Sequence, residues 1–156
     1  MLMDFTNSTL SNIGRLHPND LKFFYYDVAR FSELEQFVAY TDDDIIKIAR
    51  DFGISLKPLE QKSFSSKKYE PIENEIYFVS IKNKEKKDSY QVALLKHLRN
   101  SFSHYRITYA KGDSFLLMED KLDKRRYTMR GLVEIEKLRK LIFRLKEYSD
   151  NELYNG

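Results

Sequence analysis

The sequence predicts a mainly α-helical fold: a helical bundle with a small antiparallel β insertion, either a hairpin or three strands, between its last two helices. Apolar residues recur at intervals of three or four along several stretches, which is the spacing of one helical face. Among 156 residues there are only five glycines and three prolines, whereas one glycine-centred segment in the second half is rich in β-prone residues. The length suits a single domain over residues 1–156, in which we expect residues 1–18 to form a partly ordered N-terminal arm.

Two helices are expected in the first half of the chain. In the first, over residues 20–41, the apolar residues that share one face are Leu21, Phe24, Val28, Phe31, Leu34 and Val38. Thr41 and Asp44 then form an S/T-x-x-D/E capping pattern at the start of a short helix that ends at Gly53. We expect an irregular connection over residues 53–71, because this segment is rich in Ser and Lys and is interrupted by proline.

The most regular helix of the chain is predicted near its centre. Residues 72–79 fit a short helix before it, and the polar run over residues 82–88 fits a solvated helix end or loop. Asp88 and Gln91 can form a capping box for the central helix. Its apolar stripe is Val92, Leu95, Leu98, Phe102 and Tyr105.

The apolar period changes after the central helix. Residues 105–109 and 114–118 are short β-prone runs separated by Gly112, which predicts a β-hairpin, and residues 125–129 can add a third strand. A final helix over residues 132–148 follows. Its apolar face is Leu132, Ile135, Leu138, Ile142 and Leu145.

Composition and charge exclude several classes of function. The chain has no cysteine, which excludes a disulfide framework, a zinc–thiolate site and a thiol nucleophile. No stretch approaches ~18 uncharged apolar residues and the start lacks a signal-peptide pattern, so we expect a cytoplasmic protein without membrane contact. The net charge of +3 divides into nine basic and thirteen acidic residues before Ser80, and eighteen basic and eleven acidic residues from there on. This asymmetry fits a polyanionic or acidic partner, or a merely solvated surface.

One helix end carries three chemically distinct side chains. Arg99, Asn100 and His104 lie at the predicted C-terminal end of the central helix. At ~100° per residue, Asn100 and His104 lie ~40° apart on one face, whereas Arg99 is offset from His104 by ~140°. Two such helices around a symmetry axis could bring these residues into one cleft, so the spacing favours a dimer.

This segment resembles the motif of the HEPN superfamily, in which an Arg is followed by four to six residues and a His, usually with a polar residue directly after the Arg. Arg99-Asn100-Ser101-Phe102-Ser103-His104 fits that pattern, and a β insertion before the last helix is similar to one small-protein branch. The resemblance implies a HEPN-like bundle and a metal-independent endoribonuclease in which two protomers share one cleft. Arg99, Asn100 and His104 are then the candidate catalytic residues, and no cofactor or metal is implied.

The chemistry of RNA cleavage suits these three side chains. A His that titrates near neutral pH can accept the proton of a 2′-hydroxyl or protonate the leaving 5′-oxygen, and we assign this role to His104. Arg99 can hold the scissile phosphate and stabilise its developing charge, while Asn100 orients the phosphate or His104. The expected products carry a 2′,3′-cyclic phosphate and a 5′-hydroxyl.

Basic and aromatic residues near the predicted hairpin could bind the RNA, since Arg attracts phosphates and an aromatic ring stacks on a base. The candidates are Tyr105, Arg106, Arg125 and Arg126. Most aromatic residues of the chain must nevertheless be core. His17 and His97 have no ligand-like neighbours in the sequence, so we assign them no role and expect no metal site.

Three functional hypotheses remain open at this point. The first is a toxin or defence effector that cleaves RNA and is restrained by a separate antitoxin protein. The second is a non-catalytic HEPN-like module that binds RNA or protein. The third is a structural or interaction protein whose helix end is merely well capped, which predicts a monomer with His104 buried and hydrogen-bonded internally.

Overall fold

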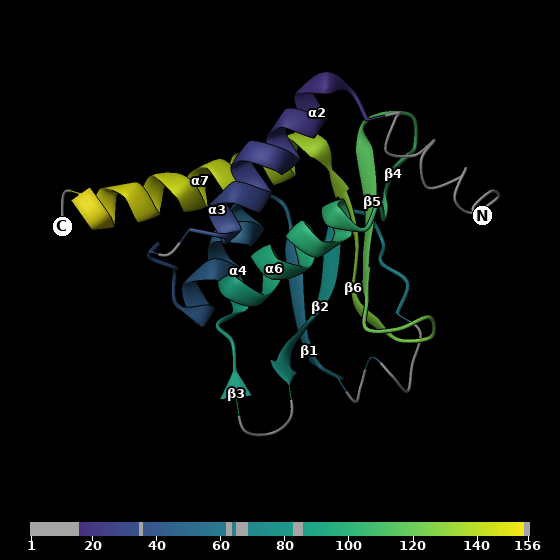
Figure 1. Ribbon diagram of the computed structural model, residues 1–156, viewed down its shortest axis with the longest axis horizontal. Helices are drawn as coiled ribbons and strands as arrows, with labels where there is room; N and C mark the ends of the chain where they lie inside the picture. Colours follow the sequence, from purple (N-terminus) through teal and green to yellow (C-terminus); the bar gives the residue numbers. More distant parts are fainter. Residues whose placement is uncertain (1–15, 35, 62–63, 65–68, 83–85, 155–156) are drawn as a thin grey trace.

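The computed structural model describes residues 16–34, 36–61, 64, 69–82 and 86–154. Helices and a mixed β-sheet both contribute to the fold (Figure 1). The predicted mainly α-helical bundle with a small β insertion is therefore wrong, and the fold is of the α+β class. The N-terminal arm predicted over residues 1–18 lies outside the described residues, apart from its last three.

The N-terminal helix is continuous but changes its winding. α2 (Pro18–Lys22), the π-helical η1 (Phe23–Ala29) and α3 (Arg30–Ser32) follow one another without a break. The helix ends well before Thr41, because the chain beyond it is held by tertiary hydrogen bonds. The Val38 N–H donates to Ser149 Oγ and the Tyr40 N–H donates to the buried Gln91 Oε1, each at 2.9 Å. These bonds replace the intrahelical ones that the predicted helix would need.

The short second helix forms where the capping pattern predicts it. α4 (Asp42–Asp51) starts after Thr41, whose hydroxyl accepts a hydrogen bond from the Asp44 N–H at 3.2 Å. Three aspartates occupy its first turn, where the positive end of the helix dipole favours negative charge. The helix is followed by Gly53, which has a φ of 84°. Glycine adopts this left-handed conformation at little cost, so the predicted stop is confirmed.

The sheet joins segments from both halves of the chain. Its strands are β1 (Ser55–Glu60), β2 (Glu75–Lys82), β4 (Ile107–Ala110), β5 (Phe115–Lys121) and β6 (Tyr127–Glu134), with the two-residue β3 (Lys86–Lys87) paired to the end of β2. The strand order is β1-β2-β6-β5-β4. β1 runs parallel to β2, and the remaining pairs are antiparallel.

β1 and β2 are the elements that make the fold prediction wrong. β1 lies within the expected irregular connection, and β2 replaces the helix expected over residues 72–79. Ile76 and Phe78 are both fully buried on the same face of β2, which is the period of a strand. Gly131 of β6 pairs with Ile76, and a Cβ at that glycine would lie only 3.1 Å from Ile76 Cγ1, so the two strands approach closely there.

The expected hairpin and third strand are present as β4, β5 and β6, but they belong to the large sheet instead of forming a separate insertion. The central helix is α6 (Tyr90–Ser103), and its cap is Ser89, not Asp88: the Ser89 hydroxyl accepts from the Val92 N–H at 3.2 Å. The final helix is α7 (Ile135–Tyr154). It starts later than predicted because Leu132 is part of β6.

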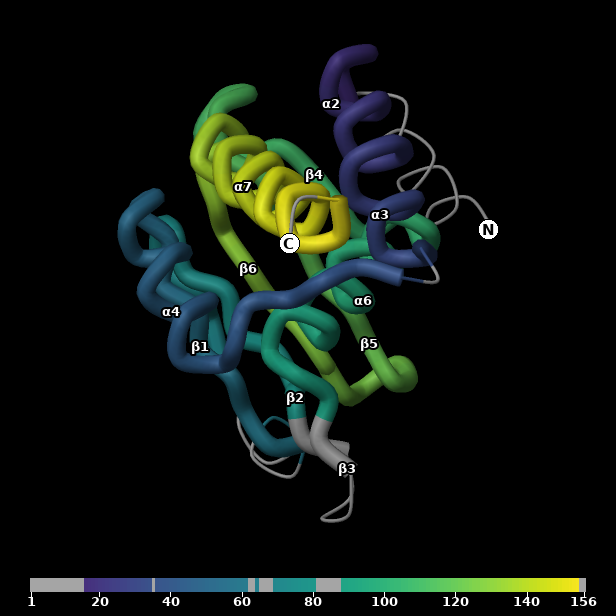
Figure 2. The backbone as a smooth tube through the Cα atoms, turned by 90° about the vertical axis from the view of Figure 1, so that its left-hand side faces the viewer, coloured from purple at the N-terminus to yellow at the C-terminus, as the bar shows by residue number. Residues whose placement is uncertain are grey.

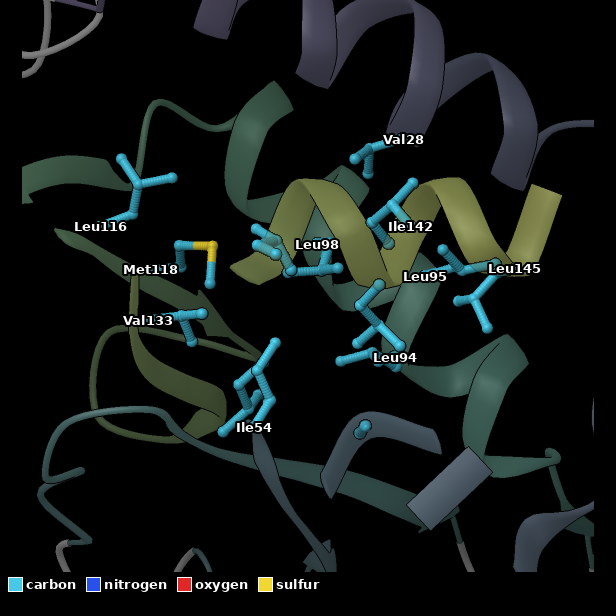
Figure 3. Close-up of a cluster of buried hydrophobic side chains, with 14 of the residues drawn as sticks. Val28, Ile54, Leu94, Leu95, Leu98, Leu116, Met118, Val133, Ile142 and Leu145 are labelled. Atoms are coloured by element: carbon cyan, nitrogen blue, oxygen red, sulfur yellow. The ribbon is translucent and has the colours of Figure 1, made fainter. Parts of the chain in front are cut away.

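The helices and the sheet share one hydrophobic core. α4, α6 and α7 lie on the same side of the strands (Figure 2), where α6 contacts β2 and β5 and α7 contacts β6. Side chains of the sheet, such as Met118 and Val133, meet Leu98 of α6 and Ile142 of α7 in this core (Figure 3). The contacts with β2 and β5 thus fix the position of α6 on the sheet. Across the described ranges, no helix has the length and apolar character needed to span a membrane.

Candidate active site at the end of helix α6

The C-terminal end of α6 carries the predicted motif and has a well-defined helix stop. The Arg106 N–H donates to the Ser101 carbonyl at 2.8 Å, and the Tyr105 N–H donates to the Phe102 carbonyl at 3.2 Å. This pair of bonds ends a helix with one residue in the left-handed region, usually a glycine. Tyr105 takes that position, with a φ of 60° and an exposed side chain. Its predicted place in the apolar stripe is therefore wrong.

A cavity of about 480 Å³ opens beside this helix end. His97, Asn100 and His104 of α6 line it together with Asp120 and Lys121 of β5. The rest of the lining is Gln61, Val79, Leu122 and Thr128. The volume lies within the range of ligand-binding pockets, ~300–1,000 Å³. Asn100 and His104 thus face one cavity, whereas Arg99 does not line it.

A buried ion pair forms one wall of the cavity. His97 Nδ1 lies 2.7 Å from Asp120 Oδ2, and His97 Nε2 lies 2.8 Å from the Val79 carbonyl oxygen. The His97 and Asp120 residues are only 6% and 5% exposed. The pair therefore connects α6 to β5 and β2 directly beneath the motif.

The surroundings of Asp120 keep its carboxylate ionised. Burial opposes the charge, but the hydrogen bond and the charge of His97, together with the Asn100 amide, outweigh it and lower the pKa of Asp120. An ionised carboxylate and a carbonyl oxygen both only accept hydrogen bonds. Both ring nitrogens of His97 therefore lie against hydrogen-bond acceptors and are engaged within the protein. With both nitrogens engaged, His97 has none left to exchange a proton with a substrate.

Asn100 connects this ion pair to Arg99. The Asn100 Nδ2 donates to Asp120 Oδ2 at 3.3 Å, and the Arg99 Nη2 donates to Asn100 Oδ1 at 3.4 Å. Both bonds are long, but together they involve the donor and the acceptor end of one amide. The Asn100 amide thereby links the Arg99 guanidinium to the Asp120 carboxylate.

His104 differs from His97 in its exposure and in its contacts. It is the C-cap residue of α6, its side chain is exposed, and it lines the cavity. Its ring makes no hydrogen bond or ion pair with the part of the chain that the structure describes. The third hypothesis predicted a buried and internally bonded His104, and the structure contradicts that prediction.

The structure places the four candidate substrate-binding residues in two separate groups. Tyr105 and Arg106 line a second cavity of about 180 Å³, and Lys121 lines both this cavity and the larger one. Arg125 and Arg126 lie in the exposed turn between β5 and β6, where Arg126 is paired with Asp123 at 2.6 Å. Arg125 is thus the more available of the two. No set of three or more His, Asp or Glu side chains in the described ranges is arranged to hold a metal ion.

Comparison with known families matches residues 16–154 to the family described as HEPN pEK499 p136. The chain belongs to this HEPN family. The superfamily resemblance carried by the motif is thereby confirmed, and a HEPN-type nuclease or a related module is indicated, since HEPN domains are often ribonucleases. Comparison with curated proteins and with solved structures gave no match.

Sequence reasoning missed His97 and Asp120 of this HEPN protein, although both left a signal. His97 and His104 are seven residues apart, which is two helical turns and therefore the same side of α6. Asp120 continues the alternation of Leu116 and Met118, so it occupies an inward-facing position of a strand. A carboxylate at such a position needs a partner, and a His on the covering helix can supply it.

The buried pair predicts a distinctive pH dependence of stability. Because the pKa of Asp120 lies below the ordinary value of ~3.9, its charge stabilises the fold above about pH 4, and this contribution is lost as the pH falls through the lowered pKa. Asp120→Asn should therefore be less stable than the parent near neutral pH, and the difference should shrink below about pH 4. Urea unfolding over a pH series measures this, with the exposed Asp43→Asn as control. If the difference in free energy of unfolding between the parent and Asp120→Asn is as large at about pH 3 as at neutral pH, the prediction is contradicted.

Proposed function

We propose that this HEPN protein is a metal-independent endoribonuclease, with Arg99, Asn100 and His104 as its catalytic residues. The observation that carries the proposal is the arrangement of Asn100 and His104 on one cavity, with Arg99 bonded to the Asn100 amide. A cation, an amide and an unengaged imidazole are the groups that phosphodiester transfer needs when no metal takes part. A module that only binds RNA does not require a free imidazole beside the phosphate-binding cation.

The proposed reaction is an internal transfer at the RNA phosphate. His104 accepts the proton of the 2′-hydroxyl, whose oxygen attacks the adjacent phosphorus and displaces the 5′-oxygen of the next nucleotide. The leaving oxygen takes up a proton, which the protonated ring of the same His104 can return. Arg99 stabilises the extra negative charge on the phosphate, because its guanidinium keeps its charge at all relevant pH values. The products are a 2′,3′-cyclic phosphate and a 5′-hydroxyl.

We propose further that the working site is shared between two protomers. Arg99 does not line the cavity that holds His104 of the same chain, as the ~140° helical offset between them predicts. A second copy facing the same helix end would bring its own Arg99 to the phosphate that lies at His104 of the first copy. A C2 dimer places two such helix ends around one axis and so completes two equivalent sites.

We propose further that the protein is a toxin or defence effector that acts by cleaving RNA. We place the protein in the cytoplasm with RNA as its substrate and a separate antitoxin protein as its regulator. Arg106, Arg125, Lys121 and the Tyr105 ring form the surface over which the RNA passes to reach His104.

The proposal first predicts the effect of replacing Arg99 and His104, the first and last residues of the motif. The parent should cleave a labelled RNA in the presence of EDTA, and both His104→Ala and Arg99→Ala should lower the rate by at least ~100-fold, the size of effect expected for an acid–base or charge-stabilising group. His17→Ala and Arg50→Ala are the matched controls, since each removes the same side chain elsewhere. Activity that survives in both motif variants contradicts the proposed site.

The shared site predicts complementation between inactive variants. If Arg99 of one protomer acts with His104 of the other, subunit exchange between Arg99→Ala and His104→Ala gives mixed dimers with one intact site. Random exchange yields about half mixed dimers, so about a quarter of the parental activity should return. The cleavage rate of the mixture, compared with each variant alone, measures this. A mixture as inactive as its components contradicts a site of this composition.

We expect Tyr105 to lower the stability of the fold through its backbone conformation and to strengthen RNA binding through its ring. A non-glycine residue in the left-handed region costs ~1–2 kcal/mol, so Tyr105→Gly should raise the free energy of unfolding or leave it unchanged. The same change removes a stacking ring and should weaken RNA binding by ~1–3 kcal/mol. Fluorescence anisotropy in a His104→Ala background measures binding without cleavage, and Tyr105→Phe should bind like the parent. Equal RNA affinity for Tyr105→Gly and the parent contradicts the contact.

A further inference from the structure

We infer that His97 and Asp120 are positioning residues of the RNA-cleaving site, which hold the Asn100 amide, and through it the Arg99 guanidinium, in the orientation that receives the phosphate. The inference rests on the proposed function. It assigns a role to two residues outside the Arg-x4-His motif, one of which comes from the sheet.

His97 and Asn100 contact the same oxygen atom of Asp120. Asp120 Oδ2 accepts from His97 Nδ1 at 2.7 Å and from Asn100 Nδ2 at 3.3 Å. The carboxylate is buried and its pKa is lowered, so it is a fixed negative charge in a poorly solvated place. Such a charge acts strongly on any dipole that contacts it.

The Asn100 side chain is a polar amide whose two ends differ. A carboxamide has a donor end and an acceptor end, and only the donor end is attracted by a carboxylate. With Nδ2 held by Asp120, Oδ1 points to Arg99 Nη2, 3.4 Å away. The reversed amide would place its oxygen against the carboxylate and its NH2 group against the guanidinium, and both contacts are repulsive. The charge of Asp120 therefore selects one of the two amide orientations.

His97 holds the Asp120 carboxylate in place. Its Nε2 donates to the Val79 carbonyl oxygen, which anchors the ring to β2, while its Nδ1 fixes the Asp120 oxygen that Asn100 uses. An aspartate without this partner could turn its carboxylate to other donors or lose its charge, since burial of an unpaired charge is costly. The backbone of the sheet thus sets the direction of Arg99 through three side chains.

A double-mutant cycle distinguishes positioning from a purely structural role. Asp120→Asn should lower kcat for RNA cleavage by about 10- to 100-fold, the cost of a misplaced catalytic group, with little change in KM. Asn100→Ala should lower kcat as well. In the Asn100→Ala background, however, Asp120→Asn should have no further effect beyond about twofold, because its target is gone. His97→Gln should follow the same pattern with a smaller loss.

Asp20→Asn is the matched control for the cycle. Asp20 is also a buried carboxylate, 5% exposed and paired with Arg139, but it lies in α2 and does not line the cavity. It should leave kcat unchanged in both backgrounds even where it lowers the melting temperature. Multiplicative effects of Asp120→Asn and Asn100→Ala on kcat would overturn the inference while leaving the ribonuclease proposal intact. A parent that cleaves no RNA removes the proposed function and the positioning role with it.

An activity-independent measurement completes the test and remains informative if a variant is unstable. In the parent, the side-chain NH2 group of Asn100 should exchange its protons slowly with solvent, as measured by NMR on 15N-labelled protein. Asp120→Ala should accelerate this exchange, whereas Asp20→Asn should not. An Asn100 amide that exchanges equally fast in all three proteins overturns the inference.

Discussion

The Asp120 carboxylate is buried where α6 crosses the sheet, and it accepts hydrogen bonds from two side chains of that helix. This contact constrains the site in two ways. It ties the helix that carries the motif to β5 and, through His97, to β2. It also gives the motif a fixed charge from which the Asn100 amide and Arg99 take their direction. The cost of burying His97 and Asp120 is offset only while both are present. Their contact therefore holds α6, β5 and β2 in fixed positions relative to one another.

The sheet consequently belongs to the site as much as the motif helix does. A bundle with a small β insertion would have left the end of α6 supported by helices alone. In the observed fold, β2 contributes the Val79 carbonyl, β5 contributes Asp120 and Lys121, and the cavity lies among them. His104 lies at the end of this framework, and its ring is not hydrogen-bonded to any residue within the described ranges. The fold thus combines a part of the site that is held by hydrogen bonds with one exposed side chain.

Much of the site could be predicted from the sequence, but less of the fold. The spacing of Arg99, Asn100 and His104 gave their relative directions on α6, because a helix converts sequence distance into angle. β1 and β2 could not be found in this way, since a short apolar run fits a strand or a helix equally well and only pairing with β6 decides between them. Asp120 was missed for the same reason: its partner lies on an element that is distant in sequence. The end of the first helix depended on tertiary bonds to Gln91 and Ser149, which local propensity does not contain.

The most direct test of the account is cleavage of a DNA oligonucleotide that contains a single ribonucleotide, incubated with the parent protein in EDTA. Only the linkage that follows the ribose has the 2′-hydroxyl that His104 is proposed to activate. The account predicts one cut at that position, with a 2′,3′-cyclic phosphate on one product and a 5′-hydroxyl on the other. Cuts at deoxyribose positions, or products with 5′-phosphate ends, would contradict it, because both require an attacking group other than the 2′-hydroxyl.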